Sequence, residues 1–162
     1  MISFEKVNVL LFDVDGVLTN GNILITESGE MLRTMHVKDG YAIKKAIEYG
    51  YHIGVITGGT SKGVVERCKF LGIKDVYHSV KDKMEMLDLF ETLYEYDRKE
   101  FLYMGDDYPD YEVMKSVGYP TCPSDAAPEI QQISKYISPI KGGEGCVRDV
   151  IFKCLRSRNL TV

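Results

Sequence analysis

The sequence contains no tryptophan, no internal repeat, no low-complexity linker and no apolar run long enough to cross a bilayer. A membrane-spanning helix needs about 20 consecutive apolar residues, so we expect no contact with a membrane. The N-terminal stretch MISFEKVNVLLFD carries a short apolar run that leads into acids and offers no small-residue cleavage site. It therefore does not resemble a secretory signal peptide.

An excess of basic residues is also missing, because 20 Lys and Arg face 24 Asp and Glu. Nucleic-acid-binding proteins usually carry a basic excess, so we expect no nucleic-acid partner. A small anionic substrate stays compatible with this balance, since it responds to the local field of a pocket. The four cysteines (Cys68, Cys122, Cys146 and Cys154) lack metal-type spacing. Reduced thiols in the cytoplasm are the simplest interpretation.

What is present is the composition of an ordinary globular chain, 44% hydrophobic and 27% charged, over 162 residues. This length predicts a single domain spanning 1–162. Six largely apolar runs predict strands, at 9–12, 52–59, 74–79, 101–107, 119–122 and 135–140. Helical patterns separate them at 39–50, 64–72, 81–97, 110–118 and 127–135, and a last helix covers 143–158. The alternation predicts an α/β, Rossmann-like three-layer fold with a parallel central sheet.

One segment departs from this alternation. Residues 22–37, NILITESGEMLRTMHV, form two alternating runs around Ser28-Gly29 and predict a β-hairpin flap. The flap is long and apolar, and an exposed edge of this kind invites pairing. Two interpretations remain open: assembly of several copies through their hairpins, or a hairpin folded back on its own domain.

Three predicted strands end in polar signatures: Asp13-Val14-Asp15-Gly16, Thr57-Gly58-Gly59 and Gly105-Asp106-Asp107-x-x-Asp110. Lys83 begins the helix between the second and the third. Each signature alone is compatible with a turn, a cap or a solvated side chain. Because the carboxyl ends of parallel strands meet at one edge of a sheet, their joint occurrence predicts one functional site.

These motifs, in this order, resemble those of the haloacid dehalogenase superfamily of phosphotransferases, over essentially the whole chain. The resemblance implies that Asp13 attacks phosphorus, forms an aspartyl-phosphate and binds Mg²⁺. Asp15 would act as general acid and then as general base, with its backbone carbonyl on the metal. Asp106 would be a further ligand, supported by Asp107. A cation fits this chemistry because a carboxylate is a weak nucleophile that an anionic phosphate repels, and Mg²⁺ prefers oxygen ligands.

The same resemblance gives roles to the remaining motifs. Thr57 and nearby backbone amides would hold phosphoryl oxygens, and Lys83 would offset charge in the transition state. Most members of the superfamily carry an inserted cap domain, but the intervals between the motifs leave no room for one. A capless site is open to water unless a neighbouring subunit closes it. Capless sugar-acid phosphatases form tetramers, so the resemblance implies a homotetramer whose subunits cover each other's sites.

Two further stretches, MHVKDGYAI and GGEGCVRDV, resemble the 3-deoxy-D-manno-octulosonate 8-phosphate phosphatases of lipopolysaccharide biosynthesis. A substrate with a carboxylate and a phosphate needs cations that can grip both. In the tail (141–162), Gly142, Gly143 and Gly145 permit a close backbone approach or a turn before the last helix. The resemblance implies substrate contacts by His36, Val37, Lys38, Asp39, Gly40, Lys44, Gly58, Gly59 and Arg67, together with Asp15, Thr57 and Lys83.

One departure bears on the substrate. Many members of the subgroup place arginine directly after Thr-Gly or one position later, where this sequence has Gly59 and Thr60. Lys62 is a candidate replacement, but it lacks a guanidinium fork. Lys44, beside Lys45 on a helix, is equally compatible with a solvated residue.

Other functions remain open. A phosphatase for 2-keto-3-deoxynonate 9-phosphate shares the capless scaffold but tends to place charged residues after Thr-Gly. A relative of the domain fused to some cytidylyltransferases is a further possibility. A non-enzymatic phospho-acceptor or binding module is disfavoured. A receiver domain carries its phospho-acceptor on the third strand, and a binding protein would be expected to lose one of the catalytic acids.

Overall fold

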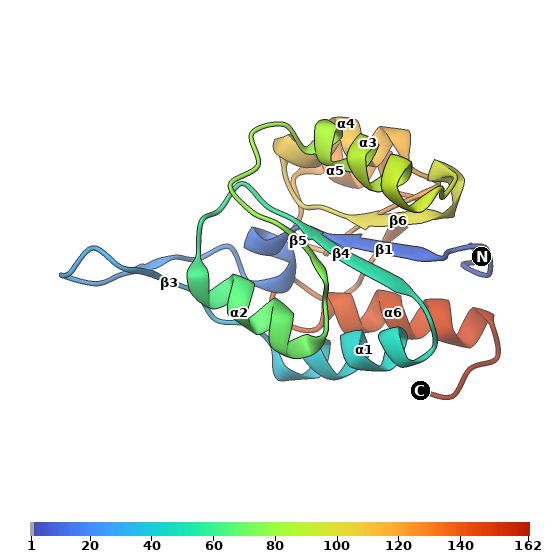
Figure 1. Cartoon of the computed structure of the whole chain (residues 1–162), viewed down its shortest axis with the longest axis horizontal. Helices are drawn as coiled ribbons and strands as arrows, with labels where there is room; N and C mark the ends of the chain where they lie inside the picture. Colours follow the sequence, from blue (N-terminus) through green and yellow to red (C-terminus); the bar gives the residue numbers. More distant parts are fainter. Residues whose placement is uncertain (1) are drawn as a thin grey trace.

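The computed structural model describes residues 2–162 and contains a six-stranded parallel sheet. The strands lie in the order β5-β4-β1-β6-β7-β8 (Figure 1). Their bounds are β1 (Val9–Phe12), β4 (His52–Ile56), β5 (Asp75–Tyr77), β6 (Phe101–Met104), β7 (Tyr119–Cys122) and β8 (Tyr136–Ile137). The predicted Rossmann-like α/β fold is confirmed, and residues 2–162 hold no separate cap domain.

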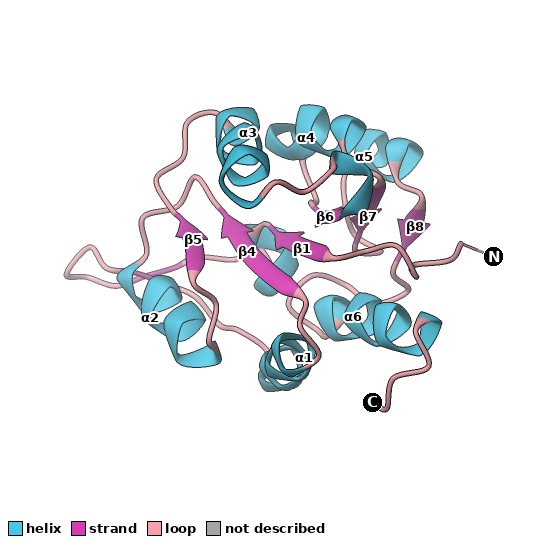
Figure 2. Cartoon of the chain, turned by 45° about the vertical axis from the view of Figure 1, so that its right-hand side comes forward, coloured by secondary structure: helices cyan, strands magenta, loops and turns pink. Residues whose placement is uncertain are grey.

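Helices cover both faces of the sheet, as Figure 2 shows. On one face lie α1 (Val37–Glu48), α2 (Lys62–Leu71) and α6 (Cys146–Ser157). On the other lie α3 (Lys83–Tyr94), α4 (Tyr111–Ser116) and α5 (Pro128–Ile133). Single-turn segments occur at Val14–Leu18, Arg98–Glu100 and Tyr108–Asp110.

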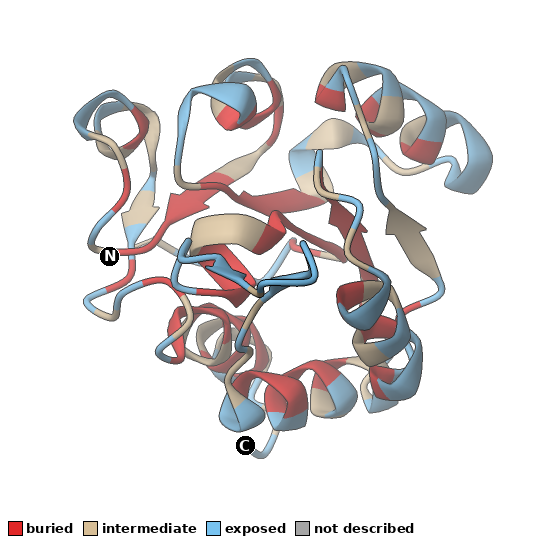
Figure 3. Ribbon diagram, turned by 90° about the vertical axis from the view of Figure 1, so that its left-hand side faces the viewer, coloured by how far each residue is buried: buried red, intermediate tan, exposed pale blue. Residues whose placement is uncertain are grey.

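The central strand β1 shows why the sequence forms this sandwich. Leu10 and Phe12 belong to the core cluster beneath α1 and α6, whereas Val9 and Leu11 belong to the cluster beneath α3 and α4. Successive side chains of a strand point to opposite faces, so an unbroken apolar run is buried on both. In Figure 3 the central strands are accordingly buried between helices whose outer surfaces are exposed.

Local signals place the helix ends. Ser61 caps α2 by accepting a hydrogen bond from the Val64 amide at 3.4 Å, and α2 ends at Leu71, followed by the C-cap Gly72, whose φ of 91° favours glycine. Asp82 caps α3 through the Met84 amide at 2.8 Å, which puts Lys83 in the first turn. Among residues 2–162, no helix is both long enough and apolar enough to cross a membrane.

The predicted hairpin is present as β2 (Leu24–Ile25) paired with β3 (Met31–Leu32). It projects from the body of the molecule (Figure 1). Its apolar side chains face solvent: Leu24 is 66% exposed, Ile25 70% and Met31 54%. The flap therefore stands away from the rest of its own chain.

The glycine-rich segment before α6 packs against the loop that follows β1. A Cβ on Gly142 would lie 1.9 Å from the Gly16 carbonyl oxygen, and one on Gly143 would lie 2.4 Å from the Asn20 amide nitrogen. The Gly143 amide also donates to the Val17 carbonyl at 3.0 Å. These glycines thus make a close backbone approach, and the partner is the chain's own loop.

Candidate active site

The strands β4, β1 and β6 are neighbours, so the polar signatures that follow them meet at one edge of the sheet. Asp13 follows β1, Thr57 follows β4, and Asp106 comes two residues after β6. All three line a cavity of about 760 Å³, together with Asp15 and Lys83. The structure therefore brings the four sequence motifs to one place.

Lys83 lies at the centre of this site. Its Nζ contacts Asp13 Oδ1 at 2.7 Å and Asp110 Oδ1 at 2.6 Å. Burial alone would lower the pKa of Lys83, but the attraction of Asp13 and Asp110 outweighs it and raises that pKa above its ordinary value. The ammonium group is therefore held charged beside the Asp13 carboxylate.

Asp110 serves to hold Lys83 in place. Its Oδ1 also accepts a hydrogen bond from the Tyr103 hydroxyl at 2.6 Å, and its Oδ2 accepts from the Asp106 amide at 3.0 Å. Gly105 makes this possible, because a Cβ there would lie 2.4 Å from the Asp110 Cβ. Both oxygens of Asp110 are thus already engaged by donors of the protein.

The clustered acids repel one another. Burial and the charge of Asp110 raise the pKa of Asp13 to about 6, against the opposing pull of Lys83. Burial, followed by the charges of Asp13, Asp110 and Asp107, raises the pKa of Asp106 to about 8. A site with these properties has too little positive charge of its own, and a divalent cation would supply it.

The donor set fits a hard cation. Oxygens of Asp13, Asp106 and Asp110 lie within 4.8 Å of one another, which is the type of site that Mg²⁺ prefers. Because Asp110 is saturated by donors, Asp13 and Asp106 are the carboxylates left to bind a metal. Gly16 leaves room for Asp106: a Cβ there would lie 2.0 Å from Asp106 Oδ2, and its φ of 92° also favours glycine.

The loop after β4 offers donors to an anion. Thr57 Oγ1 accepts a hydrogen bond from the Gly59 amide at 3.1 Å, which leaves its hydroxyl proton free to donate. Thr57 is buried, and Gly58 and Gly59 line the same cavity as Asp13. This arrangement suits a phosphoryl oxygen placed between Thr57 and Lys83.

Arg33 belongs to none of the sequence motifs, but its guanidinium forms an ion pair with the Asp15 carboxylate. Its Nε donates to Asp15 Oδ1 at 2.6 Å and its second terminal nitrogen donates to Oδ2 at 3.1 Å. Arg33 comes directly after β3, at the base of the hairpin. The sequence signal was a single arginine in the second run of the predicted hairpin, which carries no spacing relation to Asp15.

The other predicted substrate residues lie outside the cavity that contains Asp13. The His36 side chain accepts from the Lys38 amide at 3.2 Å and caps α1. Val37 and Lys38 line a separate surface pocket between α1 and α6. Within its own chain, this loop does not reach the aspartate cluster.

Two predicted basic residues gather on a different surface. Lys44 Nζ lies 4.3 Å from the ring centre of Phe70, and the Arg67 guanidinium lies 5.7 Å from it. Arg67 also packs against Gly40, where a Cβ would lie 2.7 Å from its guanidinium. Arg67 lines a second cavity, which lies between the hairpin and α2. Lys44 does not line the cavity of Asp13.

Asp39 is buried and joins α1 to α6. Its Oδ1 accepts from the Arg148 amide at 2.7 Å, and its Oδ2 has no hydrogen-bond partner among the described residues. Burial raises the pKa of Asp39 from 3.8 to about 6. Because the folded-state pKa lies above the unfolded value, the contribution of Asp39 to stability is complete below the unfolded pKa. It is lost as the pH rises through the folded pKa.

As the pH rises from about 4 to about 7, the wild type loses this contribution and Asp39→Asn does not. We therefore expect the free energy of unfolding of Asp39→Asn to rise relative to that of the wild type by up to about 3 kcal/mol over this range. Urea unfolding at both pH values measures the difference. The Asp88→Asn variant, which makes the same chemical change on the exposed side of α3, is the control for the substitution itself. A parallel pH dependence for Asp39→Asn and the wild type would contradict this role.

Comparison with known proteins gives the family. A family model described as haloacid dehalogenase-like hydrolase matches residues 69–148. The chain is 37% identical over 151 residues to 3-deoxy-D-manno-octulosonate 8-phosphate phosphatase KdsC of Escherichia coli (strain B / BL21-DE3), covering 93% of this chain and 80% of that protein.

Solved structures agree. The crystal structure of 3-deoxy-D-manno-octulosonate 8-phosphate phosphatase from Yersinia pestis matches with a TM-score of 0.94 at 32% identity, over 96% of this chain and 84% of that chain. The enzyme of that name from Moraxella catarrhalis, in complex with a magnesium ion, a phosphate ion and KDO, matches with a TM-score of 0.94 at 28% identity, over 96% and 90% of the two chains. The chain therefore belongs to the haloacid dehalogenase-like hydrolases, in the family of the 3-deoxy-D-manno-octulosonate 8-phosphate phosphatases.

Proposed function

We propose that this protein hydrolyses 3-deoxy-D-manno-octulosonate 8-phosphate to the free sugar acid and phosphate, with Mg²⁺, in the cytoplasm and as a step of lipopolysaccharide biosynthesis. The observation that carries the proposal is the contact of Lys83 with Asp13 beside Asp106, at the edge where three strands end. Similarity to phosphatases of that name over nearly the whole chain supports the choice of substrate.

In the first step, an oxygen of Asp13 attacks phosphorus and the bond from phosphorus to the sugar oxygen breaks. The electron pair stays on the sugar oxygen, which takes a proton from the Asp15 carboxyl group. Lys83 and the Thr57 hydroxyl stabilise the charge on the phosphoryl oxygens. The product is the free sugar acid and a phosphorylated Asp13.

In the second step, Asp15 takes a proton from water as the water oxygen attacks phosphorus. The bond between phosphorus and Asp13 breaks and inorganic phosphate leaves, so that Asp13 returns to its carboxylate form. Mg²⁺, held by Asp13, Asp106 and the Asp15 backbone carbonyl, would neutralise charge between nucleophile and phosphate. Asp107, exposed at the same loop, would support this set of ligands.

Phosphate release from a substrate panel tests the proposal. The panel contains the eight-carbon and nine-carbon keto-acid phosphates, a hexose phosphate and an aryl phosphate, each with MgCl₂. A clear preference for the eight-carbon substrate is expected. A preference for 2-keto-3-deoxynonate 9-phosphate would move the assignment to that alternative, and equal turnover of all four compounds would overturn the substrate.

Metal binding gives a separate prediction that needs no substrate. With MgCl₂ at about 100 times its Kd, binding stabilises the fold by about 2.7 kcal/mol, which is an increase in Tm of about 8 °C. Asp106→Asn should lose most of this increase, because it removes a carboxylate that the protein leaves without a donor. Calorimetry in MgCl₂ and in EDTA measures both values, and Asp88→Asn should respond like the wild type. An equal response of Asp106→Asn would contradict the ligand assignment.

Assembly belongs to the same proposal. The exposed apolar hairpin offers a surface on which copies of the chain can pair into a tetramer, and the catalytic cavity has no cap of its own. Loop 36–40 would then contact substrate in a neighbouring subunit. Light scattering tests this, and a Leu24→Glu, Ile25→Glu double variant should dissociate the assembly. A wild type that is monomeric at micromolar concentration would overturn it.

A further inference from the structure

The loop after β7 is connected to both loops that carry the proposed metal ligands. The Ala127 amide donates a hydrogen bond to the Asp106 carbonyl at 2.8 Å. Asp125 Oδ1 accepts a hydrogen bond from the Gly142 amide at 2.9 Å. Gly142 in turn packs on Gly16, because a Cβ on Gly142 would lie 1.9 Å from the Gly16 carbonyl oxygen. The loop after β7 therefore reaches Asp106 directly and Gly16 through Gly142.

These contacts close into a ring, since Gly16 and Asp106 also meet. A Cβ on Gly16 would lie 2.0 Å from Asp106 Oδ2, so the backbone of one loop packs against the carboxylate of the other. The ring runs from Asp106 through Asp125 and Gly142 to Gly16, and from there back to Asp106. It contains the Asp106 carboxylate and borders the Asp15 carbonyl, which are two of the groups proposed to hold Mg²⁺.

The peptide between Asp15 and Gly16 is fixed by its neighbours. Its amide donates to Oγ1 of the buried Thr19 at 3.3 Å. The carbonyl of the following peptide is the one covered by Gly142. Because a peptide is planar and trans, its carbonyl points away from its amide. The contacts with Thr19 and Gly142 thus set the direction of the Asp15 carbonyl.

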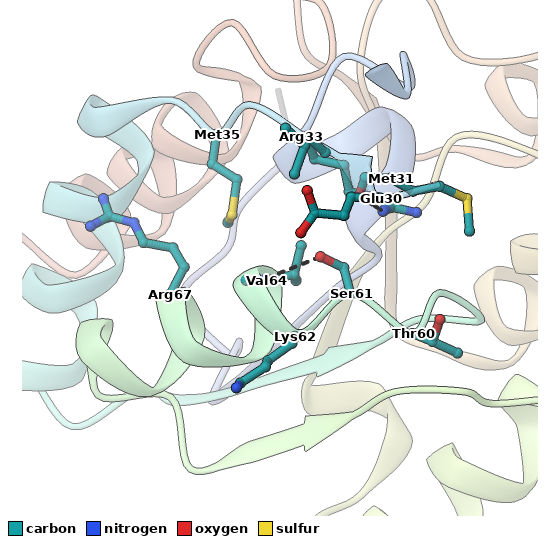
Figure 4. A pocket seen from close by; sticks show the side chains of 11 residues that line it. Glu30, Met31, Arg33, Met35, Thr60, Ser61, Lys62, Val64 and Arg67 are labelled. Carbon is teal, nitrogen blue, oxygen red and sulfur yellow. Dashed lines mark hydrogen bonds between the residues drawn. The ribbon is translucent and has the colours of Figure 1, made fainter. Parts of the chain in front are cut away.

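The hairpin supports Asp15 in a different way. Arg33 binds the Asp15 carboxylate, and Arg33 also lines the cavity of about 600 Å³ between the hairpin and α2, which Figure 4 shows. The Arg33 side chain therefore borders free space, whereas even a Cβ has no room between Gly142 and Gly16. The main chain of the loop after β1 is thus positioned from the side of Gly142.

Asp125 stabilises this arrangement from outside the catalytic cavity. Asp125 is exposed and does not line the cavity of Asp13, whereas Gly142 is buried. A buried amide that loses its acceptor is costly. Loss of the Asp125 oxygen would therefore favour a displacement of Gly142, and with it a displacement of Gly16.

We propose that Asp125 is a positioning residue for the magnesium site: by holding Gly142 against Gly16, it keeps the Asp15 carbonyl at the separation from Asp106 that one ion requires. The inference rests on the metal site of the proposed function. Mg²⁺ demands nearly ideal octahedral geometry with short bonds to oxygen, so a small displacement of one ligand lowers its affinity. Asp125 acts on the metal through the ring of contacts and does not touch it.

The test measures the Kd of MgCl₂ by titration calorimetry, without substrate. Asp125→Ala removes the acceptor of the Gly142 amide and should raise this Kd by about tenfold or more, the effect typical of residues that orient metal ligands. Asp125→Asn loses the charge but keeps an oxygen that can accept, so its Kd should stay within about twofold of the wild-type value. At saturating MgCl₂, Asp125→Ala should regain the kcat of the wild type.

Asp97→Ala is the matched control. Asp97 is also exposed, and its Oδ1 accepts from the Lys99 amide at 2.9 Å, but it lies before β6, at the end of the strands remote from the site. Its Kd for MgCl₂ should equal that of the wild type, and Tm in EDTA shows that each variant is folded.

Two results would refute the positioning role. One is an unchanged Kd in Asp125→Ala. The other is an equal increase in Asp125→Ala and Asp125→Asn, which would mean that the charge of Asp125 acts on the metal and that its hydrogen bond does not. A wild type that binds MgCl₂ but shows no preference for the eight-carbon substrate would overturn the proposed function instead, and the comparison of Kd values would still hold.

Discussion

Replacement of Asp13 by asparagine is expected to lower kcat on the order of 10⁵-fold while the protein stays folded. The side chain keeps its shape, but an amide oxygen cannot form the phosphorylated intermediate. Lys83 keeps its contact with Asp110 at 2.6 Å, so the buried ammonium retains a carboxylate partner. The change also removes one negative charge from a cluster in which burial, followed by the repulsion of neighbouring acids, raises the pKa of Asp106 to about 8.

Phosphate release under saturating substrate, together with Tm, measures these two effects separately. Asp88→Asn is the matched control, since it makes the same chemical change on an exposed part of α3. Residual turnover within tenfold of the wild type would mean that another residue is the nucleophile. A large fall in Tm would mean that the activity loss reflects folding.

Lys83→Met should cost both activity and stability. Loss of the cation next to the phosphoryl group is expected to lower kcat by about 10³-fold. Asp13 and Asp110 would then be buried without a countercharge, which lowers the free energy of unfolding by about 3–5 kcal/mol and Tm by about 10 °C. Methionine has a similar length, so the loss of charge rather than of packing decides the result.

Magnesium distinguishes the two effects of Lys83→Met. A bound cation replaces part of the missing charge, so MgCl₂ should restore part of the lost stability without restoring kcat. Lys69→Met is the control, because the Lys69 side chain is 62% exposed and its one salt bridge within residues 2–162 is with Glu66. If MgCl₂ leaves the stability of Lys83→Met unchanged, the contribution of this lysine is packing rather than charge.

The fold and the meeting of the polar signatures at the cavity of Asp13 could be predicted because their signals are local. Each buried strand is an apolar run, each run that carries chemistry is followed directly by its polar signature, and a parallel sheet brings the strand ends together. Lys83 could be included because its place at a helix start is also local. No more than this adjacency was needed to predict that Asp13, Thr57 and Asp106 share a site.

The contacts that could not be predicted are those between elements. Arg33 reaches Asp15 because the base of the hairpin lies beside the loop after β1, and no spacing rule relates the two residues. The saturation of Asp110 depends on Tyr103, which reads in the sequence as one more buried strand residue. For loop 36–40 the family resemblance implied a contact with substrate, and the structure adds that the start of α1 places Val37 and Lys38 on the side of α6, outside the cavity of their own chain.

The packing of Gly142 and Gly143 against the loop after β1 has a consequence for synthesis. The Sγ of Cys146 contacts the Val17 carbonyl across 129 residues, so the loop that carries the proposed nucleophile is supported by some of the last residues of this sequence to be translated. At ribosomal speed the interval between the two is on the order of 10 s. During that time the emerging chain holds its aspartates on a loop without its final support, and assembly of the active centre must wait for residues 142–146 to leave the ribosome.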